Sequence, residues 1–202
     1  SIPEAVDFQS ESAATQKMYG LDNKKLAGFG KNCLLARRLL ERGVPFVQVY
    51  NGGALGSPRI NWDAHEDLVR NHNNQGSLLD QPAAALLKDL KQRGMLEDTL
   101  VFWSSEFGRT PFTQGEGGKG RDHHPLAFTT WMAGAGLKPG YHHGETDEVG
   151  YQPAINPTTV YDFHATILHL MGIDHTRLTY YYNGLNRRLT DVHGHVVKDA
   201  LA

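Results

Sequence analysis

The sequence predicts an α/β protein with a largely parallel sheet flanked by helices. Segments that read as strands alternate with segments that read as helices along the 202 residues. The strand-like segments are short, rich in β-branched and aromatic residues, and bounded by turn residues. A helix between two such strands is the usual crossover that makes the strands parallel. The alternation therefore favours the α/β class.

Glycines and capping residues set the expected limits of these elements. Leucines recur at helical spacing before Gly43, and an amphipathic pattern of leucine and alanine ends at Gly94. Asn156 and Pro157 suit the first positions of a helix that Gly172 ends. The predicted strands are 44–50, 99–104 and 126–133, and the predicted helices are 24–42, 77–93 and 156–172.

We expect residues 1–202 to form a single α/β domain, because no internal repeat and no linker divides the chain. Residues 1–20 carry few large apolar side chains. This segment is predicted to be a loosely attached arm with one short helix at 10–19.

Composition argues against several classes of partner. Lys and Arg total 20 against 22 Asp and Glu, without a strong run of either sign, so no nucleic acid is expected as a partner. The longest apolar stretches fall far short of the ~20 residues that a membrane span requires. The single cysteine, Cys33, cannot form an internal disulfide. The 11 histidines are the unusual feature and suggest a metal site.

Possible metal ligands lie in three loops. In open α/β sheets, ligands bind beyond the carboxyl ends of the strands, so the loops there are the first candidates. Residues two apart in an extended segment also point to the same side. The candidates are Asp63 and His65 after the first strand, Glu106 and Arg109 after the second, and Asp122, His123 and His124 before the third.

These residue types suit zinc or manganese best, with calcium or magnesium as alternatives. Asp63, His65 and one of the two adjacent histidines would form a two-histidine, one-carboxylate site. Each residue also has a simpler interpretation. The segment "WDAHED" resembles a helix entry, Glu106 an ordinary solvated carboxylate, and Arg109 a surface charge or its ion-pair partner.

In their order, the three loops resemble the carboxyl-terminal half of the alkaline phosphatase superfamily. At closer range, "EFGRTP", "GRDHHPLAFTTWMAGAGLKPG" and "RLTDVHG" look like an uncharacterised sulfatase-like family of planctomycetes and related bacteria. This resemblance implies an alkaline-phosphatase-like fold, of which the chain is the carboxyl-terminal part of a larger domain. It also implies a metal-dependent hydrolase of phosphate or sulfate esters that is often exported from the cell.

The resemblance also implies residue roles. Asp63, His65 and His123 or His124 would hold one metal ion, and Glu106 would face a second. Arg109 would hold a non-bridging oxygen of the substrate, and Asp122 would orient an imidazole.

Two departures limit this carry-over. Phe107 stands where metal-dependent relatives usually have His, and Glu106 replaces the usual Asp. The superfamily's nucleophile would lie in an amino-terminal half that is not in this sequence. The alternatives are a non-catalytic scaffold that binds an anionic glycan or a protein partner and, more weakly, a metal-dependent isomerase or mutase.

Overall fold

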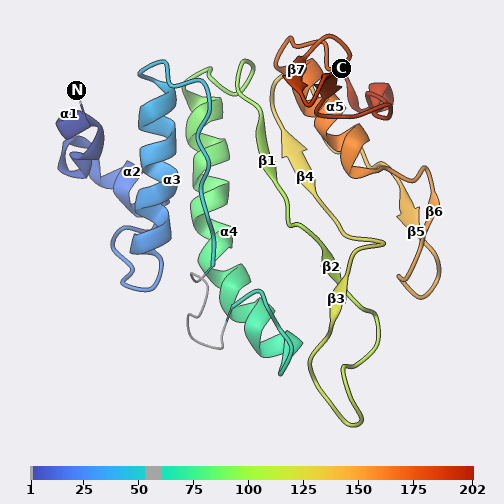
Figure 1. The fold of residues 1–202 in the computed structure, drawn as a ribbon. Helices are drawn as coiled ribbons and strands as arrows, with labels where there is room; N and C mark the ends of the chain where they lie inside the picture. The colour runs from blue at the N-terminus through green and yellow to red at the C-terminus, as the bar shows by residue number, and fades with distance from the viewer. Residues whose placement is uncertain (1, 53–60) are drawn as a thin grey trace. The chain divides into compact units, whose positions relative to one another are not determined.

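The computed structural model describes residues 2–52 and 61–202, which form two compact units (Figure 1). The first, called the helical unit here, comprises residues 1–95 and 112–122. The second, the mixed unit, comprises residues 96–111 and 123–202. Each unit has its own secondary structure and its own buried residues.

The helical unit is built around α3 and α4, which lie side by side (Figure 1). Its apolar core joins these helices to the N-terminal segment through Tyr19, Cys33, Leu34 and Ala85. Burial raises the pKa of the Cys33 thiol to about 12, so this cysteine remains protonated near neutral pH. The elements of this unit are α1 (Ile2–Val6), η1 (Phe8–Ser10), α2 (Ala13–Met18), α3 (Ala27–Leu40) and α4 (Leu68–Gln92).

Local hydrogen bonds mark the end of α3 and the start of α4. Gly43, at φ 80°, follows α3, and the backbone N–H of Val44 bonds back to the carbonyl of Leu39. Asp67 caps α4 by accepting a hydrogen bond from the backbone N–H of Arg70 at 3.0 Å. Helix α4 therefore begins nine residues before the predicted helix.

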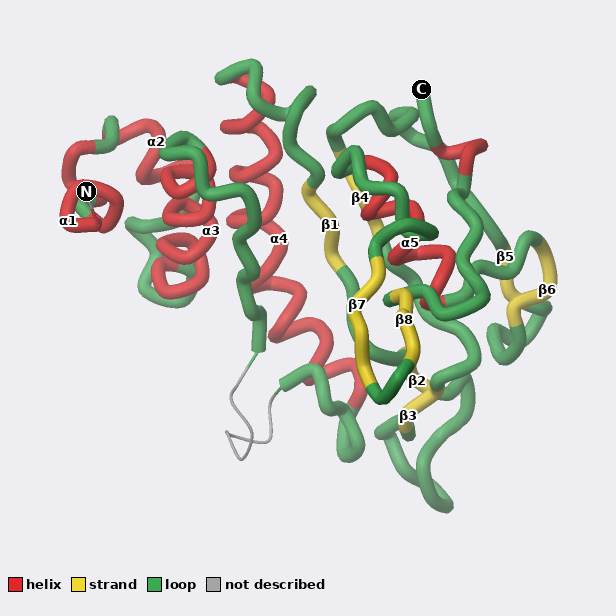
Figure 2. Tube along the Cα trace, turned by 45° about the horizontal axis from the view of Figure 1, so that its top comes forward, coloured by secondary structure: helices red, strands yellow, loops and turns green. Residues whose placement is uncertain are grey.

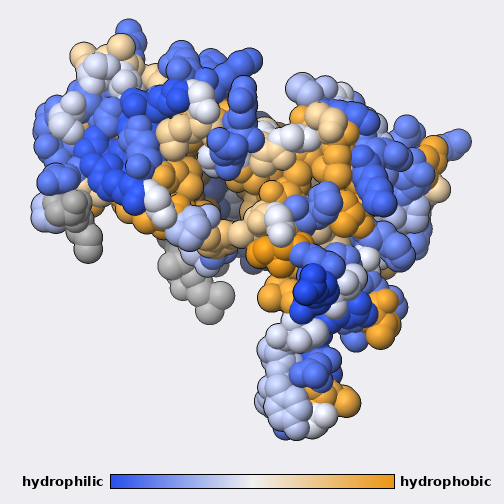
Figure 3. Space-filling model, turned by 90° about the horizontal axis from the view of Figure 1, so that it is seen from above, coloured by the Kyte–Doolittle hydropathy of each residue, from blue (hydrophilic) through white to orange (hydrophobic). Residues whose placement is uncertain are grey.

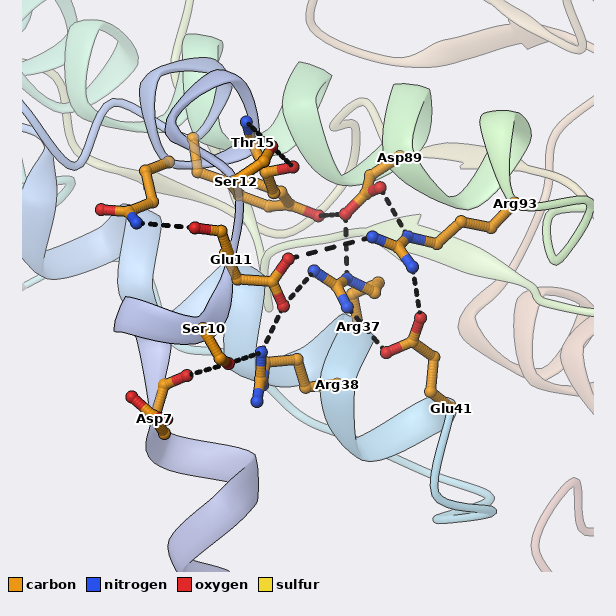
Figure 4. A network of polar contacts seen from close by, with 12 residues as sticks. Asp7, Ser10, Glu11, Ser12, Thr15, Arg37, Arg38, Glu41, Asp89 and Arg93 are labelled. Carbon is orange, nitrogen blue, oxygen red and sulfur yellow. Dashed lines mark hydrogen bonds and ion pairs between the residues drawn. The ribbon is translucent and has the colours of Figure 1, made fainter.

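Residues 1–20 contact α3 through buried groups. Ala5 is buried, and the Nε of Arg38 donates to its carbonyl at 2.8 Å. Tyr19 is fully buried and donates its hydroxyl to Asp89 on α4 at 3.0 Å. Figure 4 shows Glu11, from this segment, among the charged side chains of α3 and α4.

The mixed unit contains four two-stranded antiparallel sheets and one longer helix, α5 (Figure 2). Strands β1 and β4 pair with Val101 opposite Ala133, and the ring of Phe102 meets that of Phe163 on α5 edge to face. The elements are β1 (Val101–Trp103), β2 (Gly108–Arg109), β3 (His123–His124), β4 (Trp131–Ala133), β5 (Glu145–Thr146), β6 (Pro153–Ile155), α5 (Val160–Leu170), β7 (Thr179–Tyr182), β8 (Leu185–Arg188) and η2 (Lys198–Ala200).

The predicted largely parallel sheet flanked by helices is wrong. Every strand pair in the described residues is antiparallel, and the strands are two to four residues long. The chain between β1 and β4 contains no helix. It returns through the antiparallel pair β2–β3, so no crossover makes β1 and β4 parallel.

The predicted buried strand at 44–50 is also wrong. These residues form no ladder with any described segment, and Phe46 and Tyr50 are 56% and 76% exposed. Their β-branched and aromatic composition fits a strand, but a strand forms only where a partner edge is available. Phe46 is one of the large apolar side chains left on the surface. Figure 3 shows in orange that residues of high hydropathy are exposed at several places on the face drawn there.

No helix within the described ranges combines the length and the apolar character needed to cross a membrane.

The N-terminus of α5 carries a capping box. The side chain of Thr159 accepts from the backbone N–H of Asp162 at 3.3 Å, and the carboxylate of Asp162 accepts from the backbone N–H of Thr159 at 2.8 Å. The same carboxylate accepts from the backbone N–H of His195 at 2.7 Å. Although burial works to raise the pKa of Asp162, these hydrogen bonds lower it below its usual value.

Replacing Thr159 with alanine is expected to lower the free energy of unfolding by about 1 kcal/mol, the usual cost of losing an N-cap. Urea unfolding followed by circular dichroism measures this change. Thr158→Ala is the matched control, because Thr158 is exposed and its hydroxyl only reaches the carbonyl of Asn156, at 3.5 Å. Equal losses in the two variants would contradict the role of the cap.

Candidate metal site

A loop of the helical unit returns to the segment that precedes α4. The backbone N–H of Arg121 donates to the carbonyl of Ala64 at 3.0 Å, and that of Leu68 donates to the carbonyl of Lys119 at 3.1 Å. Asp67 and Lys119 form a parallel bridge. These backbone bonds bring residues 119–122 beside residues 63–68.

Gly120 allows this close approach. A Cβ atom at Gly120 would lie 1.7 Å from the carbonyl oxygen of His65, a distance that no side chain can occupy. The backbone of the loop therefore packs directly on the backbone of residue 65. The hydrogen bond from the backbone N–H of Gln114 to the carbonyl of Gly120, at 3.0 Å, closes the loop on itself.

Asp63, His65 and Gln114 form a connected polar group on this backbone. The Nε2 of His65 lies 2.8 Å from Oδ1 of Asp63, and its Nδ1 lies 2.7 Å from Oε1 of Gln114. Oδ1 of Asp122 lies 3.9 Å from the same Nδ1. The His65 side chain is one-third exposed, and those of Asp63 and Asp122 are more than half exposed. The imidazole is thus held between oxygens while remaining open to solvent.

The group of possible metal ligands is Asp63, His65 and His123. Asp63 and His65 belong to the helical unit, whereas His123, the residue after Asp122, belongs to the mixed unit. Carboxylates and imidazoles are suitable ligands for zinc and manganese. The part of this possible metal-binding triad that the helical unit holds by itself is therefore Asp63 and His65, with Asp122 beside them.

The two adjacent histidines have different surroundings. His124 is 2% exposed, donates through its Nε2–H to the carbonyl of Tyr151 at 2.7 Å, and stacks on the Tyr151 ring. His123 is exposed and stacks on the ring of Phe107 with 4.0 Å between centroids. Successive residues of β3 point to opposite faces, which places one imidazole in the interior of the mixed unit and the other on its surface.

Glu106 and Arg109 both lie in the mixed unit. Glu106 is exposed and accepts a hydrogen bond from the hydroxyl of Ser105 at 3.2 Å. The guanidinium of Arg109 lies 5.8 Å from the centroid of the Phe107 ring, within the range of a cation–π contact. Phe107, which stands where the resemblance predicts a ligand, is thus a ring against which both His123 and Arg109 pack.

Gln114 is the residue of the site that sequence reasoning missed. Its amide lies 49 positions from His65 in the chain, within a glycine-rich loop that carries no recognisable motif. Metal-binding histidines usually give their second ring N–H to an oxygen acceptor, and Gln114 supplies that acceptor here. This role of Gln114 can be recognised only in the folded structure, where the loop packs against residue 65.

The comparisons with known proteins identify a family and no activity. The model of the family described as "Protein of unknown function (DUF1501)" matches residues 1–201. The curated proteins and the solved structures yield no significant match. No sulfatase or alkaline phosphatase family model matches, so the resemblance to a sulfatase-like family of that superfamily is wrong. Short loops rich in Asp, Glu and His recur on unrelated folds, so their presence in this order does not identify a superfamily.

Proposed function

The chain belongs to the DUF1501 family, and because that description states no activity, we propose a function from the site itself: a divalent metal ion bound at Asp63 and His65 assists the hydrolysis of a phosphate or sulfate ester. Asp122 offers a further carboxylate, because its Oδ1 lies 3.9 Å from Nδ1 of His65. The ion would carry out the proposed chemistry, and the loop that packs on residue 65 would hold the imidazole in place to bind it.

The observation that carries this proposal is the arrangement around the His65 ring. With Nδ1–H donating to Oε1 of Gln114, Nε2 is left with its lone pair directed toward Asp63. Tetrahedral ligands about 2.1 Å from a zinc ion lie about 3.4 Å apart. Nε2 of His65 and Oδ1 of Asp63 are 2.8 Å apart, so these two atoms need to move apart by only about 0.6 Å to bind the ion together. Gln114 thus selects the tautomer that metal binding requires.

The proposed ion would activate a water molecule and attract the substrate. A three-ligand site leaves a position for water or for a substrate oxygen, and a bound zinc ion brings the pKa of water to about 7. The ion also attracts the negative oxygens of a phosphate or sulfate group. Glu106 and Arg109 belong to the mixed unit, so their roles as a ligand of a second ion and as a donor to the substrate stay predictions from the sequence.

Metal binding is tested first, on the purified protein with zinc and then manganese. We expect about one equivalent of bound ion in elemental analysis, and His65→Ala is expected to retain less than a tenth of it. Gln114→Leu should weaken binding about 10–100-fold, as loss of a group that orients a ligand does, and Gln114→Glu should restore it. His142→Ala is the control, since His142 is exposed and lies outside the triad.

Absence of bound ion in the unaltered protein would overturn the metal proposal. The hydrolysis is tested separately, with phosphate monoesters, phosphate diesters and sulfate esters as substrates. Turnover by the loaded protein should be lost in Asp63→Ala and His65→Ala and kept in His142→Ala. Binding of the ion without turnover of any of these esters would contradict the proposed hydrolysis but would still support the metal site.

A further inference from the structure

The hairpin β7–β8 of the mixed unit is exposed on both faces. Its turn consists of Asn183 at φ 49° and Gly184 at φ 81°, the two positive φ values that a type I′ turn requires. The register pairs Tyr180 with Arg187 and Tyr182 with Leu185, so these four side chains share one face. Figure 2 shows the two strands joined by this turn.

The face with Tyr180 and Tyr182 has an unusual composition for a surface. Tyr180, Tyr182 and Leu185 are each 58% exposed, and Arg187 is exposed between them. Burying such rings is favourable, so a surface that leaves two of them in water beside a leucine is typical of a binding site. Tyr181 and Arg188 occupy the opposite face, where Arg188 is half-buried.

The polar groups of this face are available to bind a ligand. The hydroxyls of Tyr180 and Tyr182 and the guanidinium of Arg187 make no hydrogen bond or ion pair with any other residue in the described part of the chain. Residues 175–190 contain three arginines and no Asp or Glu, although the whole chain has a formal net charge of −2. The hairpin is therefore a local positive region with free donors.

We propose that this face of the hairpin, Tyr180, Tyr182, Leu185 and Arg187, binds a sulfated polysaccharide. The tyrosine rings offer flat apolar surfaces for the C–H faces of sugar rings, and their hydroxyls can bond sugar hydroxyls. The fork of Arg187 can donate two parallel hydrogen bonds to a sulfate group. Each of the four side chains thereby gains a partner of matching chemistry.

Charge density favours a polysaccharide over a nucleic acid. Single-stranded nucleic acids carry a negative charge on every unit and are bound by grooves lined with many cations. This face has a single guanidinium beside two aromatic rings, which matches a polymer whose charged groups are separated by uncharged, hydroxyl-bearing rings. The choice of a sulfated over a carboxylated polysaccharide rests on the proposed hydrolysis of esters. The binding of an acidic polysaccharide in general is independent of that proposed function.

Binding to chondroitin sulfate tests this inference, measured by isothermal titration in EDTA so that no metal ion contributes. Tyr180→Ser with Tyr182→Ser should weaken binding at least tenfold, and Arg187→Gln should weaken it about fivefold and flatten its dependence on salt. The control is Tyr181→Ser with Arg188→Gln, which removes a ring and the same charge from the opposite face. The control should change affinity by less than about twofold. Thermal melts establish that the variants are folded.

Three results would overturn the proposal: no binding by the unaltered protein, an equal loss in the control, or tighter binding of oligo(dT) than of chondroitin sulfate. Equal affinity for hyaluronan, which carries carboxylates and no sulfate, would overturn the choice of sulfate. Because these measurements require no ion and no turnover, failure of the metal site leaves their outcome unchanged.

Discussion

Replacing Arg37 with methionine is expected to cause the largest loss of stability of any change in the helical unit. Arg37 is 2% exposed, and its guanidinium meets carboxylates from three segments: Glu11 at 2.8 Å, Glu41 at 2.7 Å and Asp89 at 2.9 Å (Figure 4). The Nη1 contact is a hydrogen bond, whereas the contacts of Nε and Nη2 are close ion pairs whose geometry is not that of a hydrogen bond.

The expected loss is about 3–5 kcal/mol, because removing one partner leaves buried charges without compensation. Asp89 keeps the hydroxyl of Tyr19 and the Nε of Arg93, at 2.7 Å, but loses its most buried cation. Glu11 keeps Arg38, with which it is also ion-paired. The attachment of the N-terminal segment to α3 and α4 is therefore expected to weaken first.

Urea unfolding measures this loss, and Arg42→Met, in the exposed turn just after α3, is the matched control. Arg42 makes one side-chain hydrogen bond, to the carbonyl of Arg38 at 2.8 Å, so its replacement should cost less than about 1 kcal/mol. A similar loss in both variants would show that the buried charge pairs do not stabilise the unit.

The contribution of Glu11 should disappear in acid. Burial works to raise its pKa, but hydrogen bonds and charges from Arg37 and Arg38 outweigh this and hold the pKa below the usual 4.5. A carboxyl with a lowered native pKa stabilises the fold above its unfolded pKa and ceases to do so as the pH falls through the native value. The difference between the unaltered protein and Arg37→Met should therefore shrink below pH 4.5.

The helices could be predicted because their signals are local. Leucine spacing and a terminal glycine located α3 within a few residues, since both act within one helical turn. The first nine residues of α4 were missed because Leu68 and Val69 are followed by seven residues without an apolar side chain. The side chains buried there, Asn71 and Gln75, are amides that give no apolar pattern. Only the capping residue Asp67 marked that start.

Strand pairing could not be predicted because it depends on residues far apart in the chain. Within the predicted strands 99–104 and 126–133, only 101–103 and 131–133 form strands, and composition does not state whether two strands run parallel or antiparallel. The direction follows from the path between them, which here is the hairpin β2–β3 and not a helix.

The candidate site was predictable in part for the same reason. The two-residue spacing of Asp63 and His65 predicted that their side chains lie on one side, and the 2.8 Å contact shows that they do. Gln114 and Gly120 act only through the pairing of residues 119–122 with 63–68, which no local pattern encodes. The alternation along β3 separates His123 from His124, which the sequence left as equal alternatives.

Replacing Gly120 with alanine is expected to open this loop and to remove most of the affinity for a metal ion. The added Cβ would lie 1.7 Å from the carbonyl oxygen of His65 and 2.8 Å from the backbone nitrogen of Glu66, so the two backbones must part. Parting them breaks the backbone bonds from Arg121 to Ala64 and from Leu68 to Lys119. At about 1 kcal/mol for each of the two bonds, we expect a loss of about 2 kcal/mol in the free energy of unfolding.

The expected effect on zinc affinity is a loss of about 10–100-fold, because His65 would no longer be held against Gln114. Zinc titration and urea unfolding test both effects, and Gly76→Ala in α4 is the matched control. A Cβ at Gly76 meets no atom within 4 Å, and alanine favours a helix over glycine by about 1 kcal/mol. The control should therefore gain stability and keep its affinity. Zinc binding by Gly120→Ala as tight as that of the control would mean that the contact between the two backbones does not position His65.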